Sequence, residues 1–468
     1  MKKRVLNVVS LVLALSMLVA IITGCSKGKV ADKDEQGRTI ISTDAYPDKE
    51  GKDKEDYDAK VAKFEEANPD VNVEPDNWVF DWETFYAKAE GKQLPTVFKT
   101  AFTEAKTCAE SGYVADITDA LDKYGYIEKM NPKVKEIIDQ DDKIYSFPAY
   151  SYLLCLAINT DMFEKAGLME EDGTPMQPKT WDEVVDYAKK IKAATGKAGF
   201  VFPSNGGTGG WMFTCLAWSF GADFMEQDKD GKWKATFDSE EAANALQWVK
   251  DLKWKHNVLP ANTLIDFSEY QKTYATESAA MYMTSGDSAW RYVQYGLAPE
   301  KVGMIALPAG PKRHVTLMGG TIYQVAGHST EDQIDAGIRW MDSQYGATLS
   351  EARKLFLDTE YDKKVRENQM IGAKVFNVWN DNTECVEYEN SLIAKHSNVN
   401  PNHVRLYNEF LTSDVEIQPE EPVCTQELYR TLDGCIQEVL TNENADCREV
   451  LKKANADFQA NYLNNLTF

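Results

Sequence analysis

The sequence is short of the patterns that hold metal ions and phosphate groups. Its five histidines include no His-Glu-x-x-His pair, and no two of its eight cysteines have the Cys-x-x-Cys spacing of a zinc site. Residues 226–237 fail the calcium-loop pattern because Phe237 stands where a bidentate glutamate is required. The glycines at 206–210 lead to no Gly-Lys-Ser/Thr sequence, and no Gly-x-Gly-x-x-Gly spacing occurs. We therefore expect no metal and no cofactor.

Basic residues are scarce relative to acidic ones. The chain has 51 Lys and Arg against 74 Asp and Glu, a formal net charge of −23. Such a surface repels phosphate backbones, so we expect no nucleic-acid partner. Seven cysteines follow residue 25, and an odd number cannot all pair within one chain. Whether disulfides form among the last four stays open: Cys385, Cys424, Cys435 and Cys447.

Long hydrophobic runs are absent after the first residues. The apolar run at about residues 8–22 is shorter than the ~20 residues that a membrane span needs. It follows three basic residues and ends in Thr23-Gly24-Cys25, an order that resembles a bacterial lipoprotein signal peptide. The resemblance implies that residues 1–24 are removed and Cys25 carries a lipid, with residues 25–37 as a flexible tether. The protein would then face the extracellular or periplasmic side of the cell membrane; the alternative is an uncleaved membrane helix.

The remaining chain exceeds one ordinary domain, so two domains are expected. Strand-like segments at 38–42, 71–73 and 95–99 alternate with amphipathic helical segments such as 81–90. A second unit begins near Ser151 with the same alternation, and Thr180 and Glu183 form a capping-box pattern before a helix. This order predicts an α/β fold with mainly parallel sheets covered by helices.

Four segments resemble, in order, the family 1 extracellular solute-binding proteins of ABC sugar importers. The resemblance implies a two-lobed, periplasmic-binding-protein-like (type II) fold with a hinged ligand cleft. Lobe one would hold residues 38–150 plus 305–345 and lobe two 151–304 plus 346–468, with crossings near Ser151, Leu307 and Tyr345. The matching segments are 145–148 leading into 157–168, 178–183, 279–290, and 302–308 with 319–320.

The resemblance also implies a function. The protein would be no enzyme but a monomeric binding protein that captures a carbohydrate, such as an oligosaccharide, and delivers it to ABC permease subunits in the membrane. The residues themselves leave two alternatives open. The same fold can bind another solute such as a polyamine, and a lipid-anchored glycoside hydrolase would also combine aromatic rings with carboxylates.

Trp211 is the first candidate for ligand binding. A sugar needs aromatic plates for its CH faces and fixed oxygens for its hydroxyls. Trp211 follows residues 205–210, whose glycines would let a ligand come close, and the family places a stacking aromatic there by resemblance. The alternative is a core position shared with Cys215 and Trp218.

Further candidates follow the ends of strands or lie at the first crossing. Ligands of α/β folds bind beyond the carboxyl ends of strands, which favours residues after the first and third strands. The resemblance adds residues at the hinge, after a buried strand near 281–283, and near 379, although Thr96 departs from the family pattern. Surface turns, hinge packing and lobe packing are the alternative interpretations. These candidates are Asp44, Tyr46, Thr100, Phe102, Glu104, Tyr150, Tyr152, Ser285, Asp287, Trp290 and Trp379.

Overall fold

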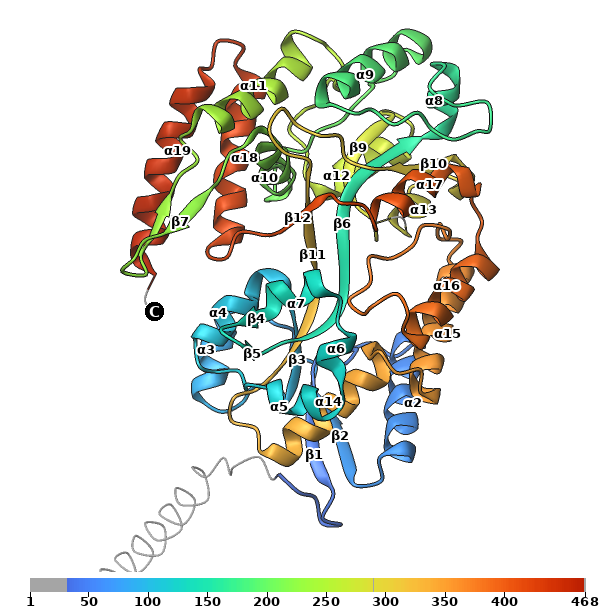
Figure 1. Ribbon diagram of the computed structural model, residues 1–468, viewed down its shortest axis with the longest axis vertical. Helices are drawn as coiled ribbons and strands as arrows, with labels where there is room; N and C mark the ends of the chain where they lie inside the picture. Colours follow the sequence, from blue (N-terminus) through green and yellow to red (C-terminus); the bar gives the residue numbers. More distant parts are fainter. Residues whose placement is uncertain (1–31, 289, 467–468) are drawn as a thin grey trace, which may run out of the picture.

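The computed structural model describes residues 32–288 and 290–466, which form two halves stacked along the long axis (Figure 1). The predicted signal peptide and Cys25 lie outside the described residues. Two long strands, β6 (Phe147–Asn159) and β11 (Val315–Val325), run from one half into the other (Figure 1). In the part of the chain that is described, no helix is both long and apolar enough to cross a bilayer.

The lower half in Figure 1 is built around the N-terminal strands. β1 pairs in parallel with β2 on one side and β3 on the other. This half contains β1 (Thr39–Thr43), α2 (Lys52–Ala67), β2 (Val71–Pro75), α3 (Trp82–Glu90), β3 (Val97–Ala101), η1 (Phe102–Glu104), α4 (Ala105–Glu110), α5 (Thr118–Lys123), α6 (Tyr126–Lys129), α7 (Pro132–Ile138), β4 (Asp139–Gln140), β5 (Lys143–Ile144) and α14 (Glu331–Tyr345).

The upper half contains most of the middle of the chain and its C-terminal helices (Figure 1). Its helices α9, α10, α11 and α18 bury one apolar core around Trp218 and Leu246. The elements are α8 (Thr160–Lys165), α9 (Trp181–Thr195), α10 (Thr208–Phe220), β7 (Met225–Gln227), β8 (Trp233–Ala235), α11 (Glu240–Trp254), α12 (Phe267–Ala275), β9 (Met281–Ser285), α13 (Trp290–Gln294), η2 (Pro299–Lys301), β10 (Val302–Ile305), α17 (Pro401–Phe410), β12 (Glu416–Pro419), α18 (Thr425–Thr441), α19 (Cys447–Asn461) and η3 (Leu463–Asn465).

The α/β fold class is confirmed, but the expectation of mainly parallel pairing needs correction. The main sheet has the order β10-β6-β11-β3-β1-β2, with β9 also on β6 and β12 also on β11. β6 pairs antiparallel with β9, β10 and β11, and β11 pairs antiparallel with β3. The physical reason is that β6 and β11 cross between the halves in opposite directions, so their neighbours cannot all run parallel.

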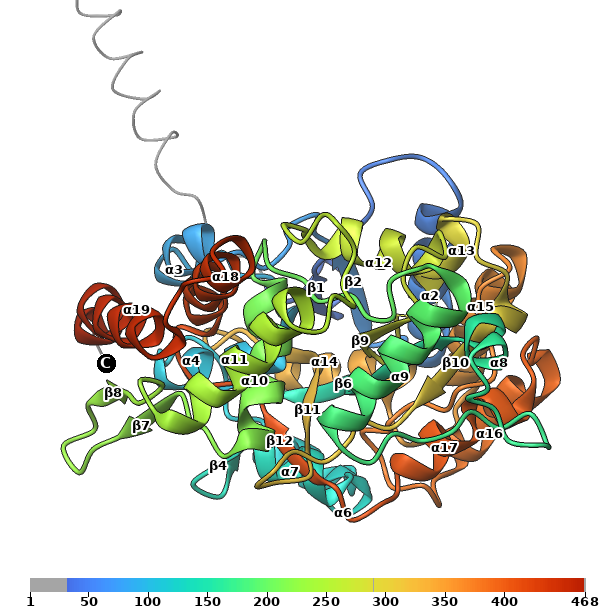
Figure 2. The same ribbon diagram turned by 90° about the horizontal axis from the view of Figure 1, so that it is seen from above.

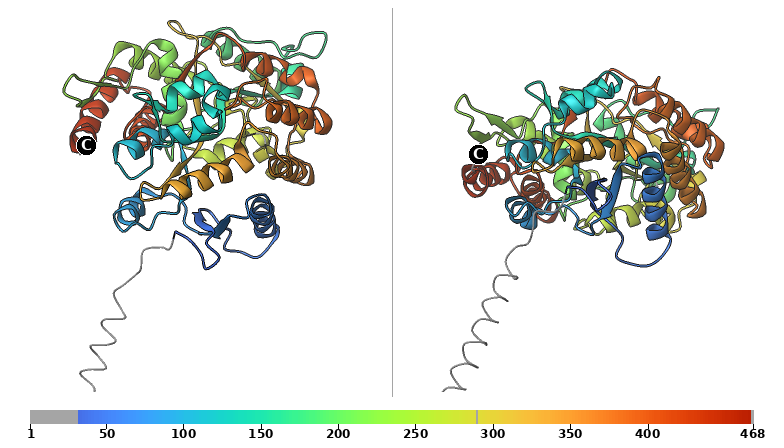
Figure 3. Two further views of the ribbon diagram at one scale, coloured as in Figure 1. Left: turned by 60° about the horizontal axis from the view of Figure 1, so that its bottom comes forward. Right: turned by 90° about the horizontal axis from the view of Figure 1, so that it is seen from below.

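Two helices lie beside the passage between the halves. α15 (Glu351–Arg366) packs against α2 and α14, and α16 (Glu384–His396) packs against α15. Figures 2 and 3 show α15 and α16 at the edge of the molecule opposite α18 and α19. The lobe boundaries expected from the sequence remain a prediction, and from this packing we propose that residues 351–366 belong with lobe one.

Candidate functional site

A cavity of about 360 Å³ lies where the chain passes between the halves. Its wall combines the middle of β6 with the loop after β9, the helices α15 and α16, and the segment 369–379. Ser151 marks the crossing: it faces Gly320 of β11, and its hydroxyl donates to the carbonyl of Phe376 at 2.7 Å. Three segments, β6, β11 and the chain around Phe376, therefore lie side by side at the crossing.

Tyr150 and Tyr152 are both half-buried in the cavity wall. They lie on one face of β6 because successive strand residues alternate. A Cβ at Gly319 would overlap the ring of Tyr152, so only glycine lets this phenol lie across β11. Burial, with the charges of Asp287 and Glu389, holds the pKa of Tyr150 well above its usual value. Burial and the charges of Glu420 and Asp287 likewise hold the pKa of Tyr152 well above its usual value. Both phenols are thus hydrogen-bond donors at neutral pH.

Trp211 extends this aromatic wall into the upper half. Its ring is half-buried in the first turn of α10 and meets Tyr152 edge-on, with centroids 6.1 Å apart and an interplanar angle of 80°. The ring centroid of Phe267 also lies 6.4 Å from that of Trp211. The indole Nε1 is buried and has no hydrogen-bond partner among the described residues. A ligand group at this ring would meet both an apolar face and a donor.

Two of the glycines before Trp211 are required by the packing of α18. A Cβ at Gly209 would meet Asp433 Oδ1 at 2.6 Å, and a Cβ at Gly210 would overlap the backbone of Tyr429. These two glycines therefore let α18 lie against the start of α10. At Gly206 and Gly207 a Cβ would make only ordinary contacts at 3.7 Å, so the expectation that these glycines admit a ligand stays a prediction.

Two carboxylates from different halves interact near the crossing. Glu420 follows β12 and accepts a 2.8 Å bond from the hydroxyl of Tyr429. Burial, together with the smaller effect of the charge of Glu104 at the end of η1 in the other half, raises the pKa of Glu420 to about 7. Glu104 itself accepts from the Thr103 hydroxyl at 2.9 Å. The charge of Glu420 also acts on Tyr152 of the aromatic wall.

The candidates after the first and third strands lie apart from the cavity lining. Asp44 is 5% exposed, accepts the Lys99 amide at 2.8 Å, and has a pKa raised by burial to about 6. Tyr46 stacks edge-on against Tyr57 and donates to Asp58 at 3.1 Å. Thr100 is buried and contacts Gln324 at 3.4 Å. These contacts are made within the lower half.

Three other candidates are largely buried. Phe102 packs in the core of the lower half. Trp379 borders the cavity, yet only 2% of it is exposed, and its Nε1 donates to the carbonyl of Tyr345 at 2.5 Å. The Ser285 hydroxyl bonds that of Ser288 at 2.6 Å, beside the cavity residues Gly286 and Asp287. The side chain of Trp290 lies outside the described residues.

Several cavity residues were missed by the sequence analysis. Arg353 of α15 is 7% exposed; it donates to the carbonyl of Gln344, and its Nε has no partner among the described residues. Tyr361 donates to Glu389 at 3.3 Å, and Tyr345 stacks on Tyr323 with centroids 5.1 Å apart. No motif marks these positions, because helical segments rich in charge look like solvated faces.

Residues 49–347 match the family model of the bacterial extracellular solute-binding proteins. The chain belongs to this family. The resemblance drawn from four short segments is therefore confirmed.

Individual relatives are distant. The sn-glycerol-3-phosphate-binding periplasmic protein UgpB of Salmonella typhimurium is 24% identical over 317 residues, which cover 63% of this chain and 68% of that protein. Maltose-bound MalE3 of T. maritima has a TM-score of 0.63 at 21% identity and covers 90% of this chain and 99% of its own. UgpB of Mycobacterium tuberculosis, in complex with glycerophosphocholine, has a TM-score of 0.66 at 15% identity, covering 91% and 98%. These likenesses establish the two-lobed fold of the family member.

Proposed function

We propose that this family member captures a carbohydrate between its two halves and delivers it to the permease subunits of an ABC transporter. The geometry at the crossing supports a sugar. Half-buried rings of Tyr152 and Trp211 offer apolar faces, and the phenols, indole N–H and nearby carboxylates offer partners for a rim of hydroxyls. The observation that carries the proposal is the buried Trp211 Nε1, which has no partner among the described residues and lies at the edge of an aromatic wall.

The proposal includes the mode of attachment and the partners. We infer from the signal-peptide pattern that Cys25 carries a lipid and that the protein works as a monomer on the outer face of the cell membrane. The family membership supports an extracellular binding role. We propose no catalytic step, and binding would instead shift the balance between open and closed arrangements of the halves.

A second candidate is a phosphate-bearing polyol. Arg353 is buried in the cavity wall with an unpartnered Nε, and guanidinium groups bind phosphate well. UgpB of Salmonella typhimurium is an sn-glycerol-3-phosphate-binding protein, and UgpB of Mycobacterium tuberculosis was solved in complex with glycerophosphocholine. Carboxylates in the same wall, Glu389 and Asp287, count against an anion.

Thermal unfolding of the chain without its first 25 residues distinguishes these ligands. The panel contains mono- and oligosaccharides, sn-glycerol 3-phosphate, glycerophosphocholine and spermidine. A ligand at ~100 times its Kd stabilises the folded state by about 2.7 kcal/mol, which raises the midpoint visibly. We expect a rise with one class of saccharide. A rise with the phosphate compounds or spermidine alone would contradict the carbohydrate proposal.

Replacing Trp211 tests the aromatic wall directly. We expect Trp211→Ala to weaken saccharide binding by ~10- to 100-fold, because the ligand loses a buried aromatic face worth about 1.5–3 kcal/mol. Titration calorimetry measures the change. The control is Trp254→Ala on α11, whose ring is 37% exposed and whose Nε1 bonds Val439. Equal affinity in both variants would exclude Trp211 from the site.

A further inference from the structure

Asp433 on α18 holds the start of a different helix. It is 3% exposed, and its two carboxylate oxygens accept the amide N–H groups of Gly207 at 2.5 Å and Gly210 at 2.8 Å. Gly207 is the N-cap of α10 and has no side chain to cap the helix. The first N–H groups of a helix have no partner within it, so Asp433 supplies the missing acceptor from another element.

The carboxylate suits this place electrostatically. Burial raises the pKa of Asp433 above its usual value, and the bonds from Gly207, Gly210 and Gly209 with the charge of Arg430 offset part of that rise. A helix N-terminus carries partial positive charge, which favours a negative group there. Asp433 therefore occupies the position that a ligand anion would otherwise take at α10.

This contact lies directly behind the aromatic wall. Trp211 follows Gly210, and its own N–H bonds the carbonyl of Gly207 at 3.0 Å. One turn before Asp433, Tyr429 packs its backbone against Gly210 and donates its hydroxyl to Glu420. One face of α18 thus holds both Trp211 and the carboxylate whose charge acts on Tyr152.

We propose that Asp433 is a positioning residue for ligand binding, which fixes the first turn of α10 so that the Trp211 ring faces Tyr152. Because it already satisfies the amides at the start of α10, the aromatic end of the site takes an uncharged part of the ligand and not a phosphate. The part of this proposal that concerns the ligand rests on the proposed carbohydrate binding. The positioning role itself can be tested without any ligand.

The first test uses the ligand-free protein. The variants are Asp433→Asn, which keeps one acceptor oxygen and loses the charge, and Asp433→Ser, which keeps one oxygen on a shorter side chain, should the first fail to fold. The control is Asp446→Asn, since Asp446 caps its own helix α19 through the amides of Arg448 and Glu449. Hydrogen exchange of residues 205–211 and acrylamide quenching of Trp211, taken as the difference from the same protein carrying Trp211→Phe, are the readouts.

We expect the Asp433 variants to raise exchange in residues 205–211 at least 10-fold and to increase Trp211 quenching, while Asp446→Asn leaves both unchanged. Unchanged exchange and quenching in a folded Asp433 variant would overturn the positioning role. Protection of residues 205–211 by inorganic phosphate in the wild-type protein would overturn the exclusion of phosphate.

The ligand arm uses maltotriose in a double-mutant cycle. We expect Asp433→Asn to weaken binding about 10-fold when Trp211 is present and less than 2-fold in the Trp211→Ala background, because both changes remove the same contact. Fully additive losses would show that Asp433 acts independently of Trp211 and would overturn the proposal. If wild-type protein does not bind maltotriose, the carbohydrate proposal fails for this sugar, and the ligand-free readouts still decide the role of Asp433.

Discussion

Two neighbouring glutamates after β12 are buried and accept hydrogen bonds from uncharged donors. Glu421 is 7% exposed and accepts from Trp218 Nε1 at 3.1 Å, while Glu420 accepts from Tyr429. Burial raises the pKa of Glu421 to about 8 and that of Glu420 to about 7. Each side chain is therefore protonated in the folded protein at pH values below its raised pKa and ionised above it.

This burial gives the stability a particular pH dependence. A glutamate whose pKa is higher in the folded than in the unfolded protein makes its full contribution to stability below the ordinary glutamate pKa. That contribution is lost as the pH rises towards 8. Between its unfolded and folded pKa values, each glutamate lowers the free energy of unfolding by up to about 1.4 kcal/mol per pH unit. We expect the free energy of unfolding to fall between pH 5 and pH 8, and to fall less in Glu421→Gln, as measured by denaturant titration.

The control for this prediction is Glu443→Gln, an exposed site between α18 and α19. It should keep the wild-type pH dependence. A decline in Glu421→Gln as steep as in the wild-type protein would show that Glu421 does not carry the effect.

Residue-scale prediction from the sequence was possible only where a local pattern existed. Trp211 could be chosen because it follows a glycine-rich stretch and matches a family position. Asp433 could not, because its partner Gly210 lies 223 residues away in the sequence. Its neighbours on α18 show ordinary helical spacing, which gives no sign of a cap supplied to another helix.

At the scale of secondary-structure elements, the packing of α10 on α18 depends on a glycine. A Cβ at Gly210 would overlap the backbone of Tyr429, whereas a Cβ at Gly434 on α18 would meet nothing within 4 Å. The first glycine is thus required by a close approach of two helices, and the second is not.

This pair predicts opposite effects of the same substitution. Gly210→Ala should lower the free energy of unfolding by roughly 1–3 kcal/mol through overpacking. Gly434→Ala should leave it unchanged or raise it by about 0.5–1 kcal/mol, because alanine favours the helix. Urea titration measures both, and a neutral Gly210→Ala would contradict the close packing described here.

Most strands of the lower half could be predicted from the sequence, but whether every extended segment joins a sheet could not. The expected strands at 38–42, 71–73 and 95–99 appear as β1, β2 and β3 with small shifts. In the upper half, the apolar residues 200–202 belong to none of the named strands of the described chain; instead the amides of Phe200 and Val201 bond the carbonyls of Val258 and Met281. Alternation signals a buried extended segment, but only neighbours distant in sequence decide whether it joins a sheet.

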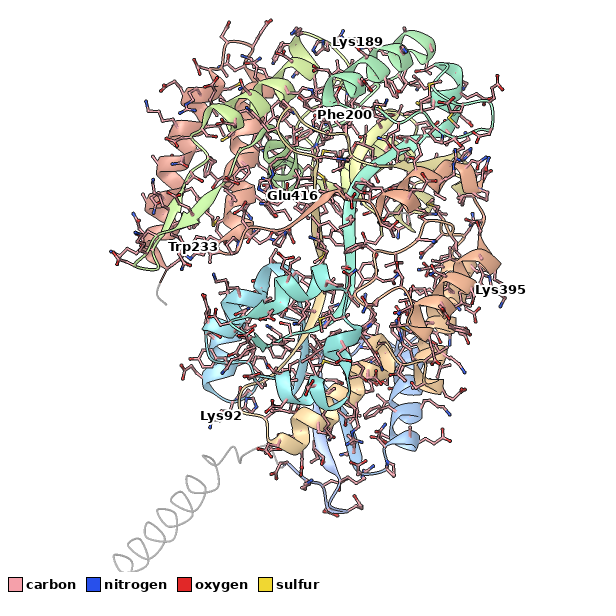
Figure 4. The ribbon with its side chains drawn as sticks, in the orientation of Figure 1. Lys92, Lys189, Phe200, Trp233, Lys395 and Glu416 are labelled. Atoms are coloured by element: carbon pink, nitrogen blue, oxygen red, sulfur yellow. The ribbon has the colours of Figure 1, made fainter. Side chains whose placement is uncertain are left out.

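At the scale of the whole molecule, the halves also touch away from the crossing. Lys106 of α4 places its Nζ 5.0 Å from the ring centroid of Trp233, which lies on the β7–β8 hairpin of the other half. Figure 4 labels Trp233 on this hairpin, above the lower half. The contact stabilises the arrangement with the halves together.

Removing this cation–π contact should therefore weaken ligand binding. A partly exposed contact of this kind is worth about 0.5–1 kcal/mol, so Lys106→Met should raise the Kd about 2- to 5-fold by favouring the open arrangement. Lys234→Met, which removes a neighbouring ion pair to Glu226 within the hairpin, is the control. Equal Kd values for the two variants by calorimetry would show that closure does not use this contact.

The most direct measurement of the central claim is hydrogen exchange with and without the saccharide that stabilises the protein. If the sugar is held between the halves, protection should appear together at residues 149–152 of β6, at 285–288 after β9, and at 205–211 before α10. Protection confined to one half, or to surfaces away from the crossing, would contradict carbohydrate capture at this site.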